Sequence, residues 1–344
     1  MMYRSATPDD GAAMLRLMES HPTGGGMNIL YTRRPDAYQS YLKECPDAEI
    51  ILCTDDDFRV LAQIVCLPKK LYIDREAQMV GYVTGLHKEE GAVVNILKML
   101  KLGYTQSAVK HFFCAILDEN QTTYDLLSKR GYIHPICGFT TCLFHPGALK
   151  SSRHQFKFHR AAPDDEKRLL EFYREAGAAY SYFPVFETMH DFAGLGVTDF
   201  FILENDGELM AAGALWDQQD YKQYIALAYH GVYKLAAHCN PLLRFLRYPP
   251  LPKTGTAAHF AYISFLLCRK DSLDMARFFL EGIAAAGRAY DFLAIGVVNG
   301  DTLKEVLRDV KKMQMGSQLC IIDYDKKASA PVYQTPVRFE CALL

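Results

Sequence analysis

The chain has 344 residues, 50% of them hydrophobic, and a formal net charge of −2 at pH 7. This length suffices for two domains of ordinary size, each with its own core. The nearly neutral charge, without a long run of Lys or Arg, argues against a nucleic-acid partner, and no apolar run is long enough to predict a membrane span. We therefore expect neither nucleic acid nor a membrane as a partner.

The ten cysteines lie singly in the sequence, and none forms a Cys-x-x-Cys pair. With no recognisable secretion signal at the amino end, this usage predicts reduced thiols and a cytoplasmic location. No spacing typical of metal ligands, such as His-Glu-x-x-His, occurs. We therefore expect no metal site.

The first half opens with a strand at residues 2–6, a turn at Pro8, Asp9 and Asp10, and an amphipathic helix at residues 11–20. A glycine-rich loop at residues 21–27 follows. The remaining pattern predicts, in order, a helix at 35–44, a hairpin with strands at 49–53 and 58–67, a strand at 78–86, a helix at 90–104, a strand at 109–117, a helix at 121–129 and a strand at 136–144.

The second half repeats the first. Residues 4–10 read Arg-Ser-Ala-Thr-Pro-Asp-Asp and residues 159–165 read His-Arg-Ala-Ala-Pro-Asp-Asp. A buried-looking strand also ends in Asn twice, at Asn120 and at Asn299. A repeat of this length indicates two copies of one unit. We place the two domains at residues 1–148 and 153–344.

The predicted elements of the second half keep the same order and add one insertion. They are a strand at 156–160, a helix at 164–176, a hairpin with strands at 200–203 and 209–216, a strand at 260–267, a helix at 273–287, a strand at 292–298, a helix at 302–310 and a strand at 319–324. The proline-rich insertion at residues 231–256 is expected to be a loop that folds over a cleft.

Three stretches carry a resemblance to the GNAT superfamily of acyl-CoA N-acyltransferases. They are the repeated opening, the strand at residues 80–86 with the loop at 87–93, and residues 120–132, which are similar to the family pattern N-x-x-A-x-x-L-Y-x-K-x-G-F. The resemblance implies a mixed α/β fold of two tandem GNAT-like domains, each a mostly antiparallel central sheet flanked by helices. It also implies acetyl-CoA or another acyl-CoA as the co-substrate.

The family binds the coenzyme pyrophosphate on a loop of the pattern Gln/Arg-x-x-Gly-x-Gly/Ala. Here Lys88 and Gly91 keep the basic residue and the middle glycine, while Val93 replaces the last small residue. The resemblance implies that the loop, including Ala92 and the preceding Leu86, holds the coenzyme, because N–H groups at the amino end of a helix attract anions. Alternatively, Gly91 only begins a helix.

Two further positions follow from the same comparison. Asn120 ends the strand beside the expected cleft, where the family contacts the pantetheine arm, although an Asn there can equally cap the next helix. In the second copy the corresponding loop has no glycine, and Asp271 and Asp274 would repel phosphate. The first copy is therefore the expected coenzyme site.

Acylation of an amine requires a neutral acceptor and a proton for the departing thiolate. Family members often use a Tyr on the last helix as this acid, but the matching positions hold Leu127 and Val306. Tyr124, one turn earlier, and His87, where the strand meets the loop, are the remaining catalytic candidates. Each also has a plain structural interpretation, as a core residue for Tyr124 and as a surface or capping residue for His87.

The resemblance implies an acyl-CoA-dependent N-acyltransferase that transfers an acetyl group to an amine of a small molecule. In this interpretation the second copy shapes the acceptor pocket or stabilises the pair of domains. Two alternatives remain open. One is a catalytically inactive protein that binds CoA, another ligand or a protein partner. The other makes the second copy the active one, with residues 231–256 as its lid.

Overall fold

The computed structural model describes residues 1–20, 22, 24–107, 109, 111–149, 156–269, 272–326 and 331–344. The elements of the first half are β1 (Met2–Ser5), α1 (Gly11–Glu19), β2 (Met27–Thr32), α2 (Ala37–Glu44), β3 (Glu49–Thr54), β4 (Val60–Ile73), β5 (Glu76–Lys88), α3 (Ile96–Gln106), β6 (His111–Leu117), α4 (Gln121–Lys129) and β7 (Ile133–Phe144).

Those of the second half are β8 (Lys157–Arg160), α5 (Glu166–Gly177), β9 (Phe200–Asn205), β10 (Glu208–Trp216), β11 (Gln223–Tyr229), α6 (Gly231–His238), α7 (Asn240–Phe245), β12 (Phe260–Cys268), α8 (Leu273–Ala286), β13 (Phe292–Val298), α9 (Thr302–Val306) and β14 (Lys312–Ile322). Short 3-10 helices are η1 (Pro8–Asp10), η2 (Pro146–Ala148), η3 (Pro163–Asp165), η4 (Met189–Phe192), η5 (Val197–Asp199) and η6 (Cys341–Leu343).

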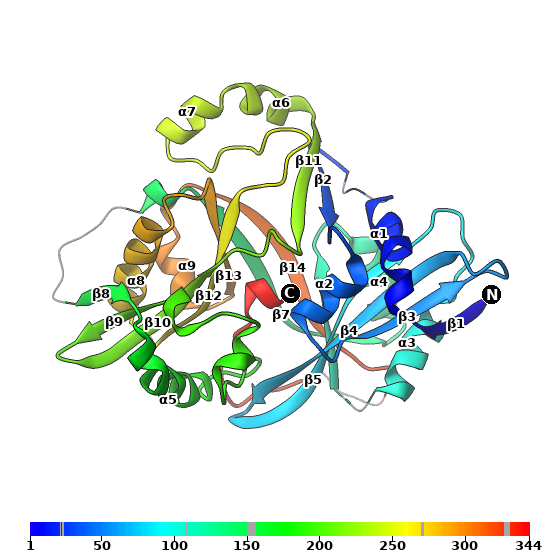
Figure 1. The fold of residues 1–344 in the computed structure, drawn as a ribbon, viewed down its shortest axis with the longest axis horizontal. Coiled ribbons are helices and arrows are strands. Elements are labelled where there is room, and N and C mark those ends of the chain that lie inside the picture. The colour runs from blue at the N-terminus through cyan, green and yellow to red at the C-terminus, as the bar shows by residue number, and fades with distance from the viewer. Residues whose placement is uncertain are drawn as a thin grey trace.

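A twelve-stranded, mostly antiparallel sheet runs through both halves, with helices on its two faces (Figure 1). Its strand order is β1-β3-β4-β5-β6-β14-β7-β13-β12-β10-β9-β8. Helices α1, α2 and α5 pack in one core on one face, while α3 and α4, and separately α8, pack against the other. The predicted mixed α/β fold of two GNAT-like units, each with a mostly antiparallel sheet, is confirmed.

The repeated opening forms the same local structure in both copies. In each, a short strand leads into a Pro-Asp-Asp turn of 3-10 helix and then into a long helix. The Asp10 carboxylate accepts the Thr7 N–H at 2.8 Å, and the Asp165 carboxylate accepts the Ala162 N–H at 2.8 Å. The last Asp of each motif therefore pairs a backbone donor that the helix leaves unpaired.

The two halves exchange their last strands. Strand β14 of the second half lies between β6 and β7 of the first half, antiparallel to both. Strand β7 in turn lies between β14 and β13 of the second half. Each half thus completes the sheet of the other, which the local sequence pattern did not predict.

Several further elements differ from the sequence predictions. Helix α3 begins at Ile96 rather than at residue 90, because Gly91 has a φ of +76° and the Asn95 side chain caps the helix by accepting the Lys98 N–H. The predicted loop at 21–27 passes into β2, which pairs with β11 in a separate two-stranded sheet. Strand β14 begins at Lys312, seven residues before the predicted start, and α9 ends at Val306.

A buried ion cluster joins the halves. Arg33 Nη2 lies 2.5 Å from Glu44 Oε2, and the Nζ of Lys222, from the second half, lies 3.7 Å from Glu44 Oε1. All three side chains are almost fully buried. Despite its burial, the two cations hold the pKa of Glu44 at about 2, so this carboxylate stays ionised between them.

Candidate functional site

In each half, one pair of neighbouring parallel strands separates along its length. Strands β5 and β6 pair only where residues 80–83 face residues 111–114, although β5 continues to Lys88 and β6 to Leu117. Strands β12 and β13 pair only where residues 260–262 face residues 292–294. We call these unpaired ends the first and second splay. A splayed pair leaves backbone groups available to a ligand.

A β-bulge lies at the base of each splay. Strand β5 shifts register against β4 at Gly85, whose φ is +59°, and β12 shifts against β10 at Phe265, whose φ is +56°. Glycine adopts this conformation readily, whereas Phe does so at a cost. The two halves therefore keep the same backbone distortion with different side chains.

The first splay is open. Leu86 on β5 is 44% exposed and Leu117 at the end of β6 is 45% exposed. The equivalent part of the second splay is closed, because Ser264 and Phe265 are fully buried and Leu266 is only 4% exposed. Large apolar side chains at the first splay are therefore left for a ligand to cover.

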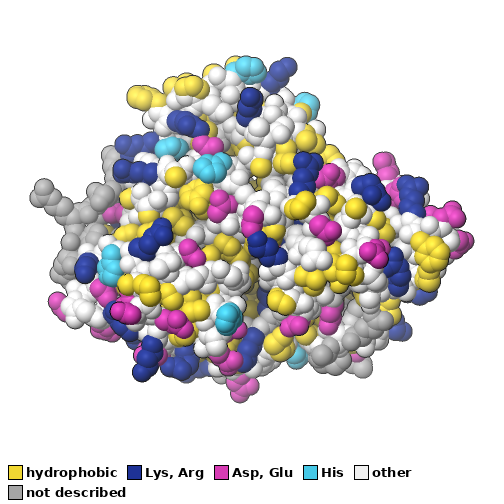
Figure 2. Space-filling model, viewed as in Figure 1, with side chains coloured by type: hydrophobic (Ala, Val, Ile, Leu, Met, Phe, Trp, Pro, Cys, Tyr) yellow, Lys and Arg dark blue, Asp and Glu magenta, His cyan; other side chains and the backbone are white. Residues whose placement is uncertain are grey.

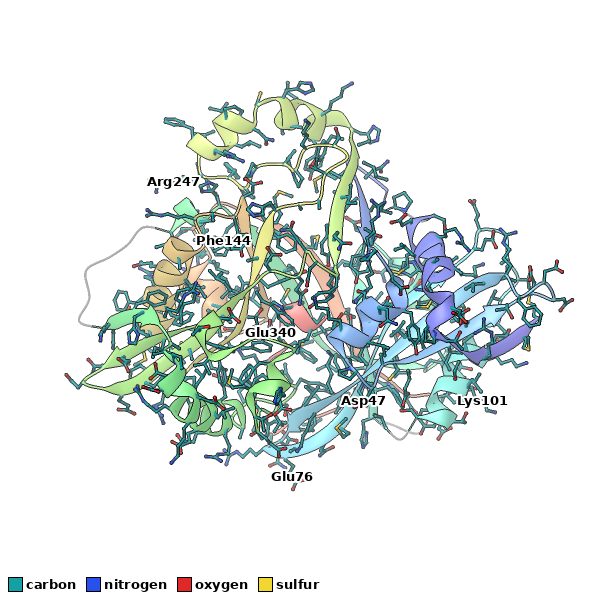
Figure 3. All side chains as sticks on the ribbon, viewed as in Figure 1. Asp47, Glu76, Lys101, Phe144, Arg247 and Glu340 are labelled. Atoms are coloured by element: carbon teal, nitrogen blue, oxygen red, sulfur yellow. The ribbon has the colours of Figure 1, made fainter. Side chains whose placement is uncertain are left out.

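The carboxyl-terminal segment at residues 339–343 fills the second splay. Glu340 Oε2 accepts the backbone N–H of Phe265 at 2.5 Å, and its Oε1 accepts the N–H of Ala342 at 3.1 Å. Cys341 packs against Gly296 of β13, where an added Cβ would lie 2.9 Å from the Cys341 Cβ. Figure 3 shows Glu340 near the centre of the molecule. Its burial raises the pKa of the carboxyl to about 7.

A cavity of about 510 Å³ lies between the halves. It touches the unpaired end of β6 through Ala115 and Leu117, but it touches β12 and β13 only along their paired residues. The cavity is thus continuous with the first splay rather than with the second. A volume of this size suits a small organic ligand.

The cavity wall is mostly apolar and carries several hydroxyls, and Leu344, the last residue of the sequence, also lines it. No Asp or Glu side chain is among the described residues that line it, and the Lys312 Nζ donates to the carbonyls of Leu307, Arg308 and Val310. The wall hydroxyls come from Thr141, Ser317 and the tyrosines Tyr82, Tyr224, Tyr229, Tyr233 and Tyr262. The apolar part of such a wall disfavours a charged amine.

The insertion forms part of this wall. Tyr233 of α6 and the stretch from Pro249 to Pro252 line the cavity. Residues 231–256 therefore cover a cleft, as predicted. They contain two short helices, however, and are not a plain loop.

Tyr82 was not singled out from the sequence. It lies on β5 in the short stretch that pairs with β6. It lines the cavity and is 4% exposed. Burial raises the pKa of its hydroxyl well above the usual value, and a hydrogen bond with Thr84, at the beginning of the splay, partly offsets this. Tyr262 is the equivalent residue of the second half, where its hydroxyl lies 3.4 Å from that of Tyr224. Only the repeat alignment could have revealed this pair.

The residues predicted to hold the coenzyme lie at the open end of the first splay. Leu86 and Lys88 end β5, and Gly91, Ala92 and Val93 form the turn between this strand and α3. The Lys88 Nζ donates to the Ala92 carbonyl at 2.9 Å, and the Ala92 N–H donates to the Glu89 carbonyl. Val93 is 85% exposed. The structure brings these residues together, although in a turn before the helix and not in its first turn.

The other predicted residues are more dispersed. Asn120 caps α4 by accepting the Thr123 N–H at 3.4 Å. Tyr124 packs with Leu127 against an apolar cluster that includes Cys114 and Ile116, and it is not among the residues that line the cavity. His87 is half-buried on β5 opposite Gln63 of β4 and does not line the cavity. The structural interpretations offered for Asn120 and Tyr124 thus match their surroundings.

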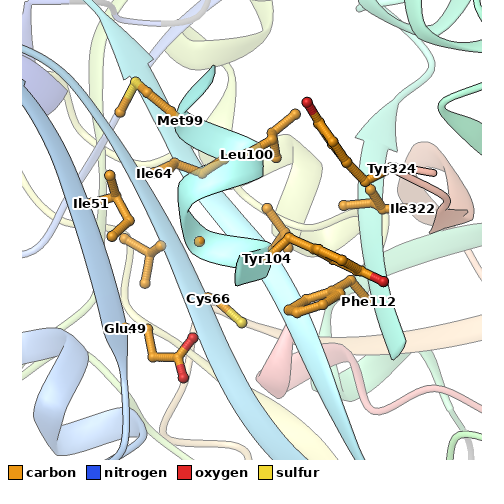
Figure 4. Close-up of a pocket in the computed structure, with 13 residues that line it drawn as sticks. Glu49, Ile51, Ile64, Cys66, Met99, Leu100, Tyr104, Phe112, Ile322 and Tyr324 are labelled. Atoms are coloured by element: carbon orange, nitrogen blue, oxygen red, sulfur yellow. The ribbon is translucent and has the colours of Figure 1, made fainter. Parts of the chain in front are cut away.

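A second pocket lies between α3 and the sheet (Figure 4). It is lined by Glu49, Cys66, Tyr104 and Phe112, among others, and its volume is about 30 Å³. This is room for about one water molecule and not for a coenzyme. Among the residues that the structure describes, no cluster of His, Cys, Asp and Glu could hold a metal ion.

No model of a known protein family matches the sequence, and no curated protein sequence matches it. Solved structures do match the fold. The alignment with a GCN5-related N-acetyltransferase from Anabaena variabilis covers 96% of this chain and 74% of that protein, with a TM-score of 0.54 and 9% sequence identity. The alignment with a probable N-acyltransferase from Enterococcus faecalis covers 94% of this chain and 73% of that protein, with a TM-score of 0.52 and 9% sequence identity.

A third match is Saccharomyces cerevisiae N-myristoyltransferase, solved with bound myristoyl-CoA and inhibitors. The alignment covers 96% of this chain and 81% of that protein, with a TM-score of 0.60 and 9% sequence identity. At such identities the likeness shows the fold alone. The chain therefore has the tandem GNAT fold that these acyl-CoA N-acyltransferases share.

Proposed function

We propose that this protein is an acyl-CoA-dependent N-acyltransferase that transfers an acetyl group from acetyl-CoA to an amine of a small molecule. The observation that carries the proposal is the contrast between the splays. The first is open, ends in the Lys88–Val93 turn and leads into the cavity, while the second is closed by the chain itself. The fold shared with N-acyltransferases supports the reaction class.

In this proposal the coenzyme enters through the first splay. The turn that contains Gly91 receives the pyrophosphate, and the unpaired strand ends at Thr84 and Leu117 accept the pantetheine arm. Backbone N–H groups in a turn with positive φ make a concave anion site. The thioester then reaches the apolar cavity, where the acceptor amine binds.

The cavity favours the reaction in two ways. Its mostly apolar surface disfavours a charged amine, and the neutral amine is the base that can attack the carbonyl. The C–N bond forms, the C–S bond breaks, the amine loses one proton and the thiolate gains one. Tyr82 keeps its proton at neutral pH and is the group best placed at the splay to donate it to the thiolate.

Coenzyme binding is tested by thermal unfolding with acetyl-CoA. A ligand at about a hundred times its Kd stabilises the folded state by about 2.7 kcal/mol and raises the Tm. Gly91→Glu should abolish this shift by placing a negative charge against phosphate. Gly91→Asn is the matched control, because Asn tolerates a positive φ and adds no charge. Leu273→Glu places the same charge at the start of α8 in the second half and should leave the shift intact.

Catalysis is tested by release of free thiol from acetyl-CoA in the presence of a panel of small amines. Release that depends on the amine supports the proposal. A thermal shift without release for any amine, and for longer acyl-CoA donors as well, would instead support the catalytically inactive alternative. Loss of the shift in Leu273→Glu but not in Gly91→Glu would move the coenzyme site to the second half.

A further inference from the structure

The insertion at residues 231–256 differs in charge from the rest of the chain. It contains Lys234, Arg244, Arg247 and Lys253 but no Asp or Glu, whereas the whole chain has a formal net charge of −2. His238 adds a group that becomes positive in acid. Positive charge is therefore concentrated on one projecting segment of an otherwise slightly acidic protein.

The same segment exposes large apolar side chains. On α7 and just after it, Leu242, Phe245 and Leu246 are 53%, 82% and 40% exposed. Their spacing of three and four residues places them on one side of the helix. On α6, Val232 is 77% exposed and Leu235 is 70% exposed. We call these five residues the lid patch.

The exposure of the lid patch does not come from a poorly packed segment. The opposite sides of the two helices pack inward, where Ala236, Ala237 and Leu243 contact a small core that includes Tyr229 and Leu251. Asn240 exchanges hydrogen bonds of 2.7 and 2.8 Å with the backbone of Leu251. The helices are thus held in place with one apolar side buried and a second one facing water.

The lid patch lies at one end of the molecule. Helices α6 and α7 project beyond the twelve-stranded sheet (Figure 1), and Figure 3 places Arg247 beside α7. In the view of Figure 2, hydrophobic, Lys or Arg and His side chains gather over this projection, whereas acidic side chains lie over the body below it. A convex end of this composition fits a broad surface better than a groove.

We propose that the lid patch binds the surface of an anionic lipid bilayer. Aliphatic and aromatic side chains beside Lys and Arg, without acids, are the composition that places short helices in the interface of such membranes. No helix of the described residues is long and apolar enough to span a membrane, so the contact is peripheral. This departs from the expectation, drawn from the composition of the whole chain, that a membrane is not a partner.

The charge of the segment argues against a second copy of the chain as the occupant. A symmetric contact through the lid patch would bring the basic residues of one segment against the same residues of the other. Like charges facing each other are unfavourable, whereas anionic headgroups compensate them. Arg244 is already paired with Asp291, which leaves Lys234, Arg247 and Lys253 as the other basic residues of the insertion that can meet a headgroup.

The position of the lid patch relates it to the cavity. Tyr233 and the stretch from Pro249 to Pro252, which line the cavity, belong to the same insertion. A bilayer that contacts α6 and α7 therefore contacts the outside of the cavity wall. An apolar substrate dissolved in the bilayer would have a short path to this wall.

The test is co-sedimentation of the full chain with vesicles of equimolar phosphatidylcholine and phosphatidylglycerol, compared with vesicles of phosphatidylcholine alone. We expect binding to the mixed vesicles that weakens as salt is added. Phe245→Asp should weaken it about tenfold or more, because the apolar contact of one Phe is lost. Lys234→Gln and Arg247→Gln should each weaken it about fivefold.

Phe58→Asp is the matched control. Phe58 is also exposed, at 66%, but it lies in the turn between β3 and β4 beside Asp55, Asp56 and Asp57. Its substitution adds the same charge far from the lid patch and should leave binding unchanged. Because both sites are exposed, Tm values close to that of the natural protein would show that both variants fold.

Three outcomes would overturn the proposal. The first is no binding of the natural protein to the mixed vesicles. The second is an equal loss of binding in Phe58→Asp and Phe245→Asp. The third is a dimer in solution that Phe245→Asp converts to a monomer, without an effect on vesicle binding. None of these results depends on acyl transfer, so failure here and failure of the proposed function are distinguishable.

Discussion

The two splays have the same backbone arrangement but differ in how far their side chains are exposed. Each has a parallel strand pair that separates and a bulge with positive φ, yet Leu86 is half exposed in the first and Leu266 is buried in the second. In the second splay, Leu266 packs in the core that contains α8, and Phe265 packs against aromatic residues that include Phe186 and Trp216. Glu340 and its neighbours occupy the second splay, while the first is bordered by the cavity.

This comparison shows how a duplicated unit can divide its roles. The exchange of β7 and β14 makes the two sheets one, so neither copy can be lost without breaking the other. The second copy is then free to close its own splay and to contribute wall residues such as Tyr262 to the cavity beside the first. Only the first of the two splays is then left open to a ligand.

The largest expected effect is a difference in the free energy of unfolding between substitutions at the two splays. Leu266→Ala should lower the free energy of unfolding by about 2–5 kcal/mol, since it leaves a cavity in a closed site. Leu86→Ala, at the equivalent position, should change it by less than about 0.5 kcal/mol, because its side chain already meets water. Urea unfolding of both variants measures this. Equal effects would show that the two splays do not differ in packing.

The second effect concerns the carboxyl that closes the second splay. Burial raises the pKa of Glu340 from an ordinary 4.5 to about 7, so the folded state binds this proton more tightly than the unfolded state. The stabilisation is complete below the unfolded value and is lost as the pH rises through about 7. It amounts to about 3 kcal/mol.

Glu340→Gln removes the ionisation and keeps an acceptor for the Phe265 N–H. The stability of the natural protein should therefore fall between about pH 5 and about pH 8 more than that of the variant does. Urea unfolding at both pH values compares them. A variant with the same decline as the natural protein would mean that Glu340 does not titrate in this range.

The third effect compares two equivalent tyrosines. Tyr82→Phe should lower kcat about a hundredfold if its hydroxyl supplies the proton to the thiolate. Tyr262→Phe should lower kcat less than about tenfold, because this residue belongs to the closed second splay, where the proposal places no coenzyme. Steady-state kinetics with acetyl-CoA and an accepted amine measure both. A larger loss in Tyr262→Phe would assign the reaction to the second half.

The sequence predicts the parts of the fold that depend on local pattern. The Pro-Asp-Asp turns, the strand alternation and the tandem GNAT order follow from residues that are near one another in the chain, and the structure confirms them. The placement of β14 between β6 and β7 could not be predicted in this way. It depends on pairing across about 200 residues, for which hydrophobic periodicity carries no signal.

The candidate site shows the same limit. The predicted coenzyme residues, from Leu86 to Val93, do lie together because they follow one another in a strand and a turn. The closure of the second splay by Glu340 was not predicted, since nothing in the local pattern near residue 340 indicates a partner in β12. Tyr82 was missed for a related reason, because a buried strand Tyr gives the same pattern whether it faces a core or a cavity.

Hydrogen–deuterium exchange with and without acetyl-CoA tests the central claim most directly. The account predicts that the coenzyme slows exchange in residues 84–95, at the first splay, and leaves residues 264–268, at the second, unchanged. Slowed exchange at the second splay without any at the first would contradict it.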